Sequence, residues 1–389
     1  KSKVKFVVDS GILISKVIDG RFPDYSKVIP KDNNKILQIN LNEFRFDAGP
    51  SLFTMPQLVD ELFELSGKNS KEYFDYERLN NLCNYFFEDG TIIHASANGD
   101  EFAKEFGAQI ADLMKKHGGG NRRLAIDTLS HIGCDALRAQ GLELVEGEQI
   151  TETARAVKSK EELVLMQASM DVCEEGVRSM QDALEPGITE NALWAKLHET
   201  NIRLGGEWIE TRLLSSGPRT NPWFRECSMR KIEKGDMISF DTDLVGPYGY
   251  CSDISRAWVC GEKPTDEQRR LYAIAFEQIE YNISELKAGM TFREVSEICW
   301  TIPDEYLSQR YPSLIHGVGL ADEYPAIKHW FDYEKLGYDG LLEVGMVLCV
   351  ESFIGVEGGR EGVKLDEQVI VAETGVERQS SYPFALEML

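Results

Sequence analysis

A chain of 389 residues, with 42% hydrophobic and 28% charged residues, is typical of an ordinary globular protein with about two or three domains. The net charge of −23 argues against anionic partners such as nucleic acids and membrane surfaces, and no apolar run reaches the roughly 18 residues that a membrane helix needs. Eight scattered cysteines without a CxxC pair favour reduced thiols and a cytoplasmic location.

The amino-terminal third has elements of mixed character. Because the chain begins with Lys1 and not with methionine, we expect a trimmed or partial sequence, and its first residues do not resemble a signal peptide. Residues 81–95, NLCNYFFEDGTIIHA, predict a β-hairpin with Asp89 and Gly90 at its turn. The glycine-rich segment 117–127 predicts a turn that leads into a strand.

A long amphipathic helix is predicted after Ser159, which forms a capping-box signature with Glu162. Apolar residues then recur at spacings of three and four: Leu163, Met166, Met170, Cys173, Val177 and Met180. Pro186 and Gly187 end the pattern. We interpret this methionine-rich stripe as core packing and not as a cofactor site.

Two segments repeat the pattern Leu-x-x-Gly-x-Thr, one from Leu184 and one from Leu286. Thr189 and Thr291 are placed to cap the helix that follows each segment. The repeat predicts two similar α/β halves within one domain, with a site at the interface between the halves.

Acidic residues follow or interrupt apolar strands in the last third of the chain. Residues 237–240 predict a strand that delivers Asp241 and Asp243 at its end, and Asp253 follows on the next strand of a hairpin. The run GMVLCVE predicts an apolar strand ending in Glu351. The run GVKLDEQVIV predicts a strand with Asp366 and Glu367 at its centre.

These carboxylates favour a metal site. Each alone has an ordinary interpretation as a turn residue, a strand end or an edge charge, and His316 could be a hydrogen-bonded core imidazole. Burying several carboxylates is costly unless they are paired or bind a cation, and we expect no Lys or Arg to balance them. Only His316 and His329 lie beyond position 200, so the ligands must be mostly oxygen atoms.

The order of these residues resembles the pita-bread metalloenzymes, a family that includes methionine aminopeptidases, prolidases, aminopeptidase P and creatinase. The segments GDMISFD, SDISR, HGVG, GMVLCVE and GVKLDE resemble its ligand motifs in the same order, over roughly residues 105–389. The resemblance implies an α/β pita-bread catalytic domain at residues 156–389, after a smaller amino-terminal α/β region at residues 1–155. It also implies two divalent metal ions.

Two departures from the peptidase pattern narrow the resemblance. Trp223 and Asp322 stand where the peptidases place histidines that handle the scissile amide, and ordinary peptide hydrolysis is therefore not expected. Segments such as GGEWIETRLLSSGPRTNPWF, HGVGLADEYP and CVES resemble the dimethylsulfoniopropionate lyases of the DddP type. This branch implies a homodimer that splits a small zwitterionic sulfonium substrate to acrylate and dimethyl sulfide, with iron as the expected metal and zinc, manganese or another transition metal as alternatives.

The same resemblance implies the roles of individual residues. The implied metal ligands are Asp241, Asp243, Asp253, His316, Glu351 and Asp366. Asp366 is shorter than the glutamate that the family has there, so either the metal shifts or the neighbouring Glu367 substitutes. Asp322 is the candidate general base, and Tyr311 is a candidate to hold a carboxylate, with an ordinary surface tyrosine as the alternative. Trp208, Trp223 and Phe224 are candidates to face the sulfonium, with core packing as the alternative.

Other functions stay open at this stage. A metallohydrolase of the same fold, acting as an Xaa-Pro peptidase or a creatinase-like enzyme, is one alternative, and a non-catalytic pita-bread binding module is another. Part of residues 37–104 resembles carotenoid (phytoene-type) desaturases, so residues 1–104 are of uncertain origin. The segment VVDSGILIS has Asp9 and Ile14 where a dinucleotide fingerprint requires glycine, and no flavin binding is expected.

Overall fold

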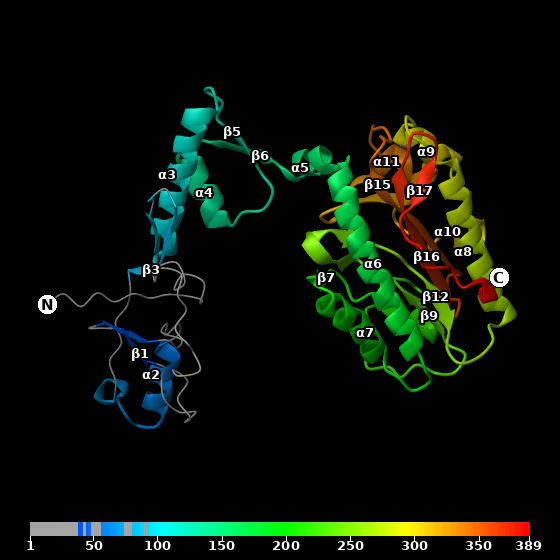
Figure 1. Ribbon diagram of the computed structural model, residues 1–389, viewed down its shortest axis with the longest axis horizontal. Coiled ribbons are helices and arrows are strands. Elements are labelled where there is room, and N and C mark those ends of the chain that lie inside the picture. The colour runs from blue at the N-terminus through cyan, green and yellow to red at the C-terminus, as the bar shows by residue number, and fades with distance from the viewer. Residues whose placement is uncertain (1–37, 42–43, 48–55, 74–79, 89, 91) are drawn as a thin grey trace. The chain divides into compact units, whose positions relative to one another are not determined.

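The protein is described by a computed structural model that covers residues 38–389 except 42–43, 48–55, 74–79, 89 and 91 (Figure 1). Its contacts divide the chain into two compact units, Lys1–Glu146 and Gly147–Leu389. The domain boundary after residue 155 stays a prediction. The segment VVDSGILIS lies outside the described residues. No helix in the described part of the chain is long and apolar enough to cross a membrane.

The first unit consists of short strand pairs and helices. β3 (Asn81–Phe86) pairs antiparallel with β4 (Ile92–Ser96), which confirms the predicted hairpin. β5 (Arg123–Ile126), the strand predicted after the glycine-rich turn, pairs parallel with β6 (Glu143–Glu146) across α4 (His131–Ala139). The remaining elements are β1 (Gln38–Leu41), β2 (Phe44–Asp47), α2 (Pro56–Leu65), the 3-10 turn η2 (Ser70–Glu72) and α3 (Gly99–His117).

The second unit combines helices with three antiparallel sheets. The sheets have the strand orders β12-β9-β8, β11-β10-β7 and β14-β13-β15-β16-β17. Their strands are β7 (Trp208–Ile209), β8 (Leu214–Ser216), β9 (Met237–Phe240), β10 (Leu244–Val245), β11 (Cys251–Ser252), β12 (Ala257–Val259), β13 (Ile315–Val318), β14 (Asp322–Ile327), β15 (Val347–Gly355), β16 (Gly362–Val371) and β17 (Val376–Arg378). The helices are α5 (Glu148–Arg155), α6 (Lys160–Ala183), α7 (Glu190–Arg203), α8 (Asp266–Glu285), α9 (Phe292–Ile298), α10 (Asp304–Leu307) and α11 (Trp330–Leu336), with 3-10 turns η3 (Gly217–Arg219), η4 (Pro247–Gly249) and η5 (Leu386–Met388).

The long helix α6 forms as its sequence predicts. Ser159 accepts a hydrogen bond from the backbone N–H of Glu162, and the Glu162 side chain accepts one from Ser159 in return. Five residues of the predicted stripe are fully buried, namely Met166, Met170, Cys173, Val177 and Met180, and Leu163 is partly buried against the core, which confirms core packing. α6 contacts β10 and β11, and α7 contacts β7 and β8. α8 contacts β15 and β16 in the other half (Figure 1).

The internal repeat is also a structural repeat. The two Leu-x-x-Gly-x-Thr segments follow α6 and α8, and Thr189 and Thr291 cap α7 and α9 as predicted. Gly187 and Gly289 both have positive φ, at 101° and 85°, where a side chain would be strained. The segments therefore make the same turn in both halves.

One predicted strand is longer than expected. The strand predicted to end at Glu351 continues to Gly355, so Glu351 lies in the middle of β15. Phe353 and Ile354 beyond it are buried and pair with Lys364 and Val363 of β16. Because the burial continues past Glu351, the strand does not end there. Residues before and after Glu351 pair with β16 and fix its position.

Candidate metal centre

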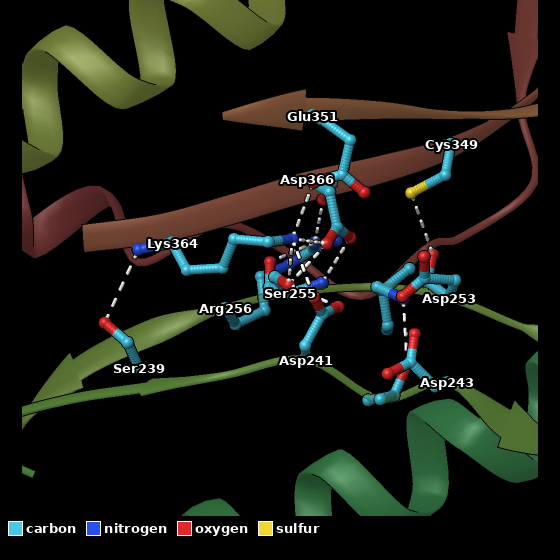
Figure 2. A network of polar contacts seen from close by, with 12 residues as sticks. Ser239, Asp241, Asp243, Asp253, Ser255, Arg256, Cys349, Glu351, Lys364 and Asp366 are labelled. Carbon is cyan, nitrogen blue, oxygen red and sulfur yellow. Dashed lines mark hydrogen bonds and ion pairs between the residues drawn. The ribbon is translucent and has the colours of Figure 1, made fainter. Parts of the chain in front are cut away.

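Buried strands from both halves of the second unit carry the acidic residues of the site. β9 is buried at every position and ends directly before Asp241, and Asp253 follows β11. Glu351 on β15 and Asp366 on β16 come from the other half. Figure 2 shows these side chains converging between the strands, together with Lys364 and Ser255.

The donor atoms form three overlapping groups, each with all ligand atoms within 4.8 Å of one another. The groups are Asp253, His316, Cys349 and Glu351; Asp241, Asp253 and Asp366; and Asp243, Asp253 and Asp322. Asp253 belongs to all three, and all six predicted ligands appear in at least one. Oxygen and imidazole donors in such groups suit a divalent transition metal.

Asp253 is the residue that most needs a cation. It is buried, and neither oxygen accepts a hydrogen bond; the His316 Nε2 atom lies 3.3 Å from its Oδ2. Burial, followed by the charge of Asp366, raises the pKa of Asp253 to about 6. A buried carboxylate without donors is costly unless it binds a cation, and the residues present therefore fit a metal ion.

His316 is oriented as a ligand would be. Its Nδ1 lies 3.1 Å from the Gly317 carbonyl oxygen, and its Nε2 lies 3.0 Å from Glu351 Oε1. A proton on Nδ1, donated to the carbonyl, would leave Nε2 free to bind a metal. Burial acts against a charge on the ring, but the nearby carboxylates of Asp253 and Glu351 raise the pKa of His316 well above its ordinary value, so this point of the site favours positive charge.

Lys364 corrects the expectation that no basic residue balances the carboxylates. Its fully buried ammonium lies 3.1 Å from Asp241 Oδ2 and 2.8 Å from Glu351 Oε2, and it also pairs with Asp366 (Figure 2). The residue stands two positions before Asp366 on β16, and side chains two apart on a strand share a face. The cluster is thus partly neutralised by the protein itself.

Lys364 and Ser255 also separate the acidities of two neighbouring carboxylates. Burial raises the pKa of Asp241 well above its ordinary range, although Lys364 acts against it. Burial acts on Asp366 in the same sense, but the charge and hydrogen bond of Lys364 and the hydrogen bond of Ser255 lower its pKa. Asp366 is therefore held as a carboxylate. It accepts hydrogen bonds from both the backbone N–H and the hydroxyl of Ser255.

Glu367 lies on the other face of β16. Its Oε2 accepts a hydrogen bond from Arg256 Nη2 at 3.0 Å, and Arg256 is itself fully buried. Because neighbouring residues of a strand point to opposite faces, Glu367 points away from the cluster, and the alternative that it substitutes for Asp366 is wrong. The shorter Asp366 is the acid that faces the cluster.

Asp322 begins β14 and lies in one donor group with Asp243 and Asp253. Although part of the residue reaches the surface, desolvation and the charge of Asp253 raise the pKa of Asp322 well above its ordinary range. The next residue, Glu323, is buried and pairs with Arg155 and with Lys158, whose Nζ lies 3.2 Å away. These pairs tie the strand that carries Asp322 to α5 and to the start of α6.

Aromatic side chains form one wall beside the carboxylates. The Lys364 ammonium lies 4.8 Å from the centroid of the Tyr311 ring, and Phe224 lies 5.4 Å from the same ring. Trp223 is stacked on Phe353 at 5.9 Å. Trp208 is 54% exposed on β7, and among the described residues no ring contact joins it to this wall. Burial, then the charges of Glu351 and Asp241, raise the pKa of Tyr311, so its hydroxyl keeps its proton.

Three residues of the site were missed by sequence reasoning. Lys364 and Cys349 could have been found, because each stands two positions before an expected ligand on the same strand face. Ser255 stands two positions after Asp253, but no strand joins the two residues. Its contacts with Asp241 and Asp366 depend on the packing of distant segments, which the sequence does not reveal.

Comparisons with known proteins agree with this geometry. A model of metallopeptidase family M24 matches residues 164–373. The chain is 45% identical over 309 residues to dimethylsulfoniopropionate lyase DddP of Roseovarius nubinhibens, covering 77% of this chain and 67% of the relative. It is 43% identical over 306 residues to DddP of Roseobacter denitrificans, with the same coverage.

Solved structures show the same fold at lower identity. The Xaa-Pro dipeptidase from Bacillus anthracis has a TM-score of 0.65 and 24% identity, over 76% of this chain and 81% of its own. The prolidase from Pyrococcus furiosus has a TM-score of 0.60 and 24% identity, over 74% and 80%. The predicted pita-bread fold is thus confirmed. The chain belongs to metallopeptidase family M24 and is a homologue of the dimethylsulfoniopropionate lyases DddP.

Proposed function

We propose that the chain is a metal-dependent carbon–sulfur lyase that cleaves dimethylsulfoniopropionate to acrylate and dimethyl sulfide. The homology to two DddP lyases at 45% and 43% identity supports the reaction class. The placing of Asp322 within 4.8 Å of the Asp243 and Asp253 ligand atoms is the structural observation that carries the proposal. It puts a carboxylate, a proton acceptor, beside the proposed metal ligands.

The proposed reaction is a β-elimination. The carboxylate of Asp322 takes the proton from the carbon next to the substrate carboxylate, and a raised pKa makes it a stronger base. The electron pair of the broken C–H bond forms the carbon–carbon double bond of acrylate. The C–S bond breaks at the same time, and sulfur keeps its electron pair and leaves as neutral dimethyl sulfide. A divalent metal bound at the carboxylates would supply a Lewis acid for the negative charge of the substrate carboxylate.

The ligands in this proposal are Asp241, Asp243, Asp253, His316, Glu351 and Asp366. Tyr311 keeps its proton, so its hydroxyl can donate a hydrogen bond to the substrate or product carboxylate. Trp223 and Phe224 offer ring faces to the sulfonium, since an aromatic face attracts a cation. We exclude Trp208 from this role because, unlike Phe224, it has no ring contact with the wall in the described part of the chain.

The finer parts of the proposal concern the metal and the assembly. We propose two metal ions per chain with iron as the metal, in a homodimer located in the cytoplasm. Elemental analysis tests the number and identity of the metal ions, and size-exclusion chromatography with light scattering tests the homodimer. A metallohydrolase of the same fold is the second candidate, supported by the M24 match and the prolidase-like fold.

One assay pair separates the two candidates. Metal-loaded protein is given dimethylsulfoniopropionate, and dimethyl sulfide is measured in the headspace and acrylate in solution. The same preparation is given Xaa-Pro dipeptides, and free proline is measured. Release of dimethyl sulfide and acrylate in equal amounts is expected, without proline. A metal-loaded protein that releases neither product would refute the lyase proposal.

A further inference from the structure

The loop of residues 217–227, here the aromatic loop, carries Trp223 and Phe224 and is closed at its base by one buried carboxylate. Glu190, the first residue of α7, is fully buried. Its Oε1 accepts hydrogen bonds from Ser216 N at 2.9 Å and Oγ at 2.7 Å, just before the loop. Its Oε2 accepts them from Ser228 N at 3.0 Å and Oγ at 2.5 Å, just after it. Both ends of the loop are thus fastened to one side chain.

Arginine side chains complete this clamp. Arg219, within the aromatic loop, lies 3.2 Å from Glu190, and it also donates a hydrogen bond to the Glu226 carbonyl at 2.7 Å. Arg230 donates to Ser216 Oγ at 2.6 Å. Charge-assisted hydrogen bonds are stronger than neutral ones, so the closure of the loop depends on the negative charge at position 190.

The middle of the aromatic loop is fastened to the strands that carry the proposed ligands. Asn221 Nδ2 donates to the carbonyl oxygens of Val356 at 2.7 Å and Gly359 at 3.1 Å, between β15 and β16. Thr220 Oγ1 accepts from the N–H of Gly362 at 3.0 Å. Phe224 holds a φ of 67°, which a residue other than glycine adopts only when its surroundings impose it.

We propose that Glu190 is a positioning residue for the cationic end of the substrate. This role rests on the proposed lyase function. Glu190 acts through the aromatic loop, which holds Trp223 against Phe353 and Phe224 against Tyr311. Glu190 touches neither the proposed ligands nor the base, and it therefore sets affinity for the cation and not the rate of proton removal.

A second buried carboxylate provides a matched control. Glu174 on α6 is 8% exposed and accepts hydrogen bonds from Ser380 Oγ at 3.1 Å, Ser381 Oγ at 2.8 Å and Tyr382 N at 3.1 Å. It fastens the carboxyl-terminal segment to α6 in the way that Glu190 fastens the aromatic loop, but among the described residues it has no contact with that loop. Substitution of Glu174 therefore measures how the loss of a buried, hydrogen-bonded carboxylate affects the protein when the aromatic loop is left intact.

The test compares Glu190→Gln with Glu174→Gln in the metal-loaded full chain. We measure KM and kcat for dimethylsulfoniopropionate. Calorimetry gives the Kd for tetramethylammonium, a cation without a carboxylate, and the Kd for acrylate, a carboxylate without a cation. Glu190→Gln should raise KM and the Kd for tetramethylammonium about fivefold or more while kcat and the Kd for acrylate stay within about twofold. Glu174→Gln should lower the melting temperature and leave KM and both Kd values unchanged.

Two further outcomes keep the proposal open to refutation. If Glu190→Gln does not fold, the milder Ser228→Ala, which removes one donor, should still weaken tetramethylammonium binding. Equal shifts of the Kd for tetramethylammonium in the Glu190 and Glu174 variants, or none in either, would overturn the positioning role. If the wild-type protein releases no dimethyl sulfide but its tetramethylammonium binding depends on Glu190, the lyase proposal fails and the positioning role stands.

Discussion

Glu351 on β15 and Asp366 on β16 lie directly opposite each other in the antiparallel sheet, although both are acidic. Like charges in this arrangement repel and destabilise a sheet. The ammonium of Lys364 touches both carboxylates and also Asp241. Positive charge between the strands offsets this repulsion: Lys364 supplies one charge, and a bound divalent metal would add more.

Neighbouring residues on β16 give a sharp test of the ligand set. Asp366→Asn keeps the shape of the side chain but removes its charge from the cluster, and metal affinity should fall at least about tenfold. Glu367→Gln changes the opposite face, where the partner is Arg256, and should leave metal affinity unchanged. Elemental analysis after dialysis against a fixed free metal concentration measures both. Equal metal loss in the two variants would contradict the assignment of Asp366.

Lys364→Met tests the balance of charge. Removing the ammonium leaves Asp241, Glu351 and Asp366 buried without it, and the free energy of unfolding should fall by about 3–5 kcal/mol in chelator. Added metal should raise the free energy of unfolding more in this variant than in the wild type. In the variant, the metal ion is not repelled by the Lys364 ammonium and alone offsets the charge of the carboxylates. Melting temperatures with and without metal measure the effect. An equal gain in both proteins would mean that Lys364 and the metal act independently.

The fold and most of the proposed site could be predicted because local sequence signals mark them. Apolar runs of strand length place Asp241 and Asp366, and the Ser159 and Thr189 caps mark where helices begin. Signals of this kind depend only on residues close in the chain.

The parts that could not be predicted depend on contacts between distant segments. Ser255 reaches Asp366 across 111 positions, and Glu190 reaches Ser216 and Ser228 across 26 and 38. Serine and glutamate are common on protein surfaces, so nothing in the neighbouring residues marks them as buried partners. The continuation of β15 past Glu351 was missed for a related reason: its cause is burial against β16, which the strand's own residues do not show.

Asp322→Asn tests the base assignment. The amide keeps the size of the side chain but cannot take the proton, so release of dimethyl sulfide should fall by about 10²–10⁴-fold. Metal content should be unchanged, since Asp322 is not among the proposed ligands. Headspace analysis and elemental analysis of the same sample measure the two effects. Activity retained within about twofold would show that another group removes the proton.

His329 predicts a loss of stability in acid. The residue is 4% exposed, and its Nε2 lies 3.1 Å from the Tyr311 carbonyl oxygen, to which a neutral ring can donate. Burial lowers the pKa of His329 from 6.5 to about 4, so the folded protein binds this proton more weakly than the unfolded chain. The stabilising contribution is therefore complete above pH 6.5 and is lost as the pH falls toward 4, by about 2 kcal/mol at pH 5.

His329→Gln isolates this effect, because a glutamine does not take up the proton. The free energy of unfolding, measured by denaturant titration between pH 7.5 and 5, should fall about 2 kcal/mol further in the wild type than in the variant. All other acid-sensitive groups are shared by the two proteins and cancel in the difference. His131→Gln, at an exposed histidine, serves as the control and should follow the wild-type curve. Parallel curves for wild type and His329→Gln would mean that the folded protein accommodates the charged ring.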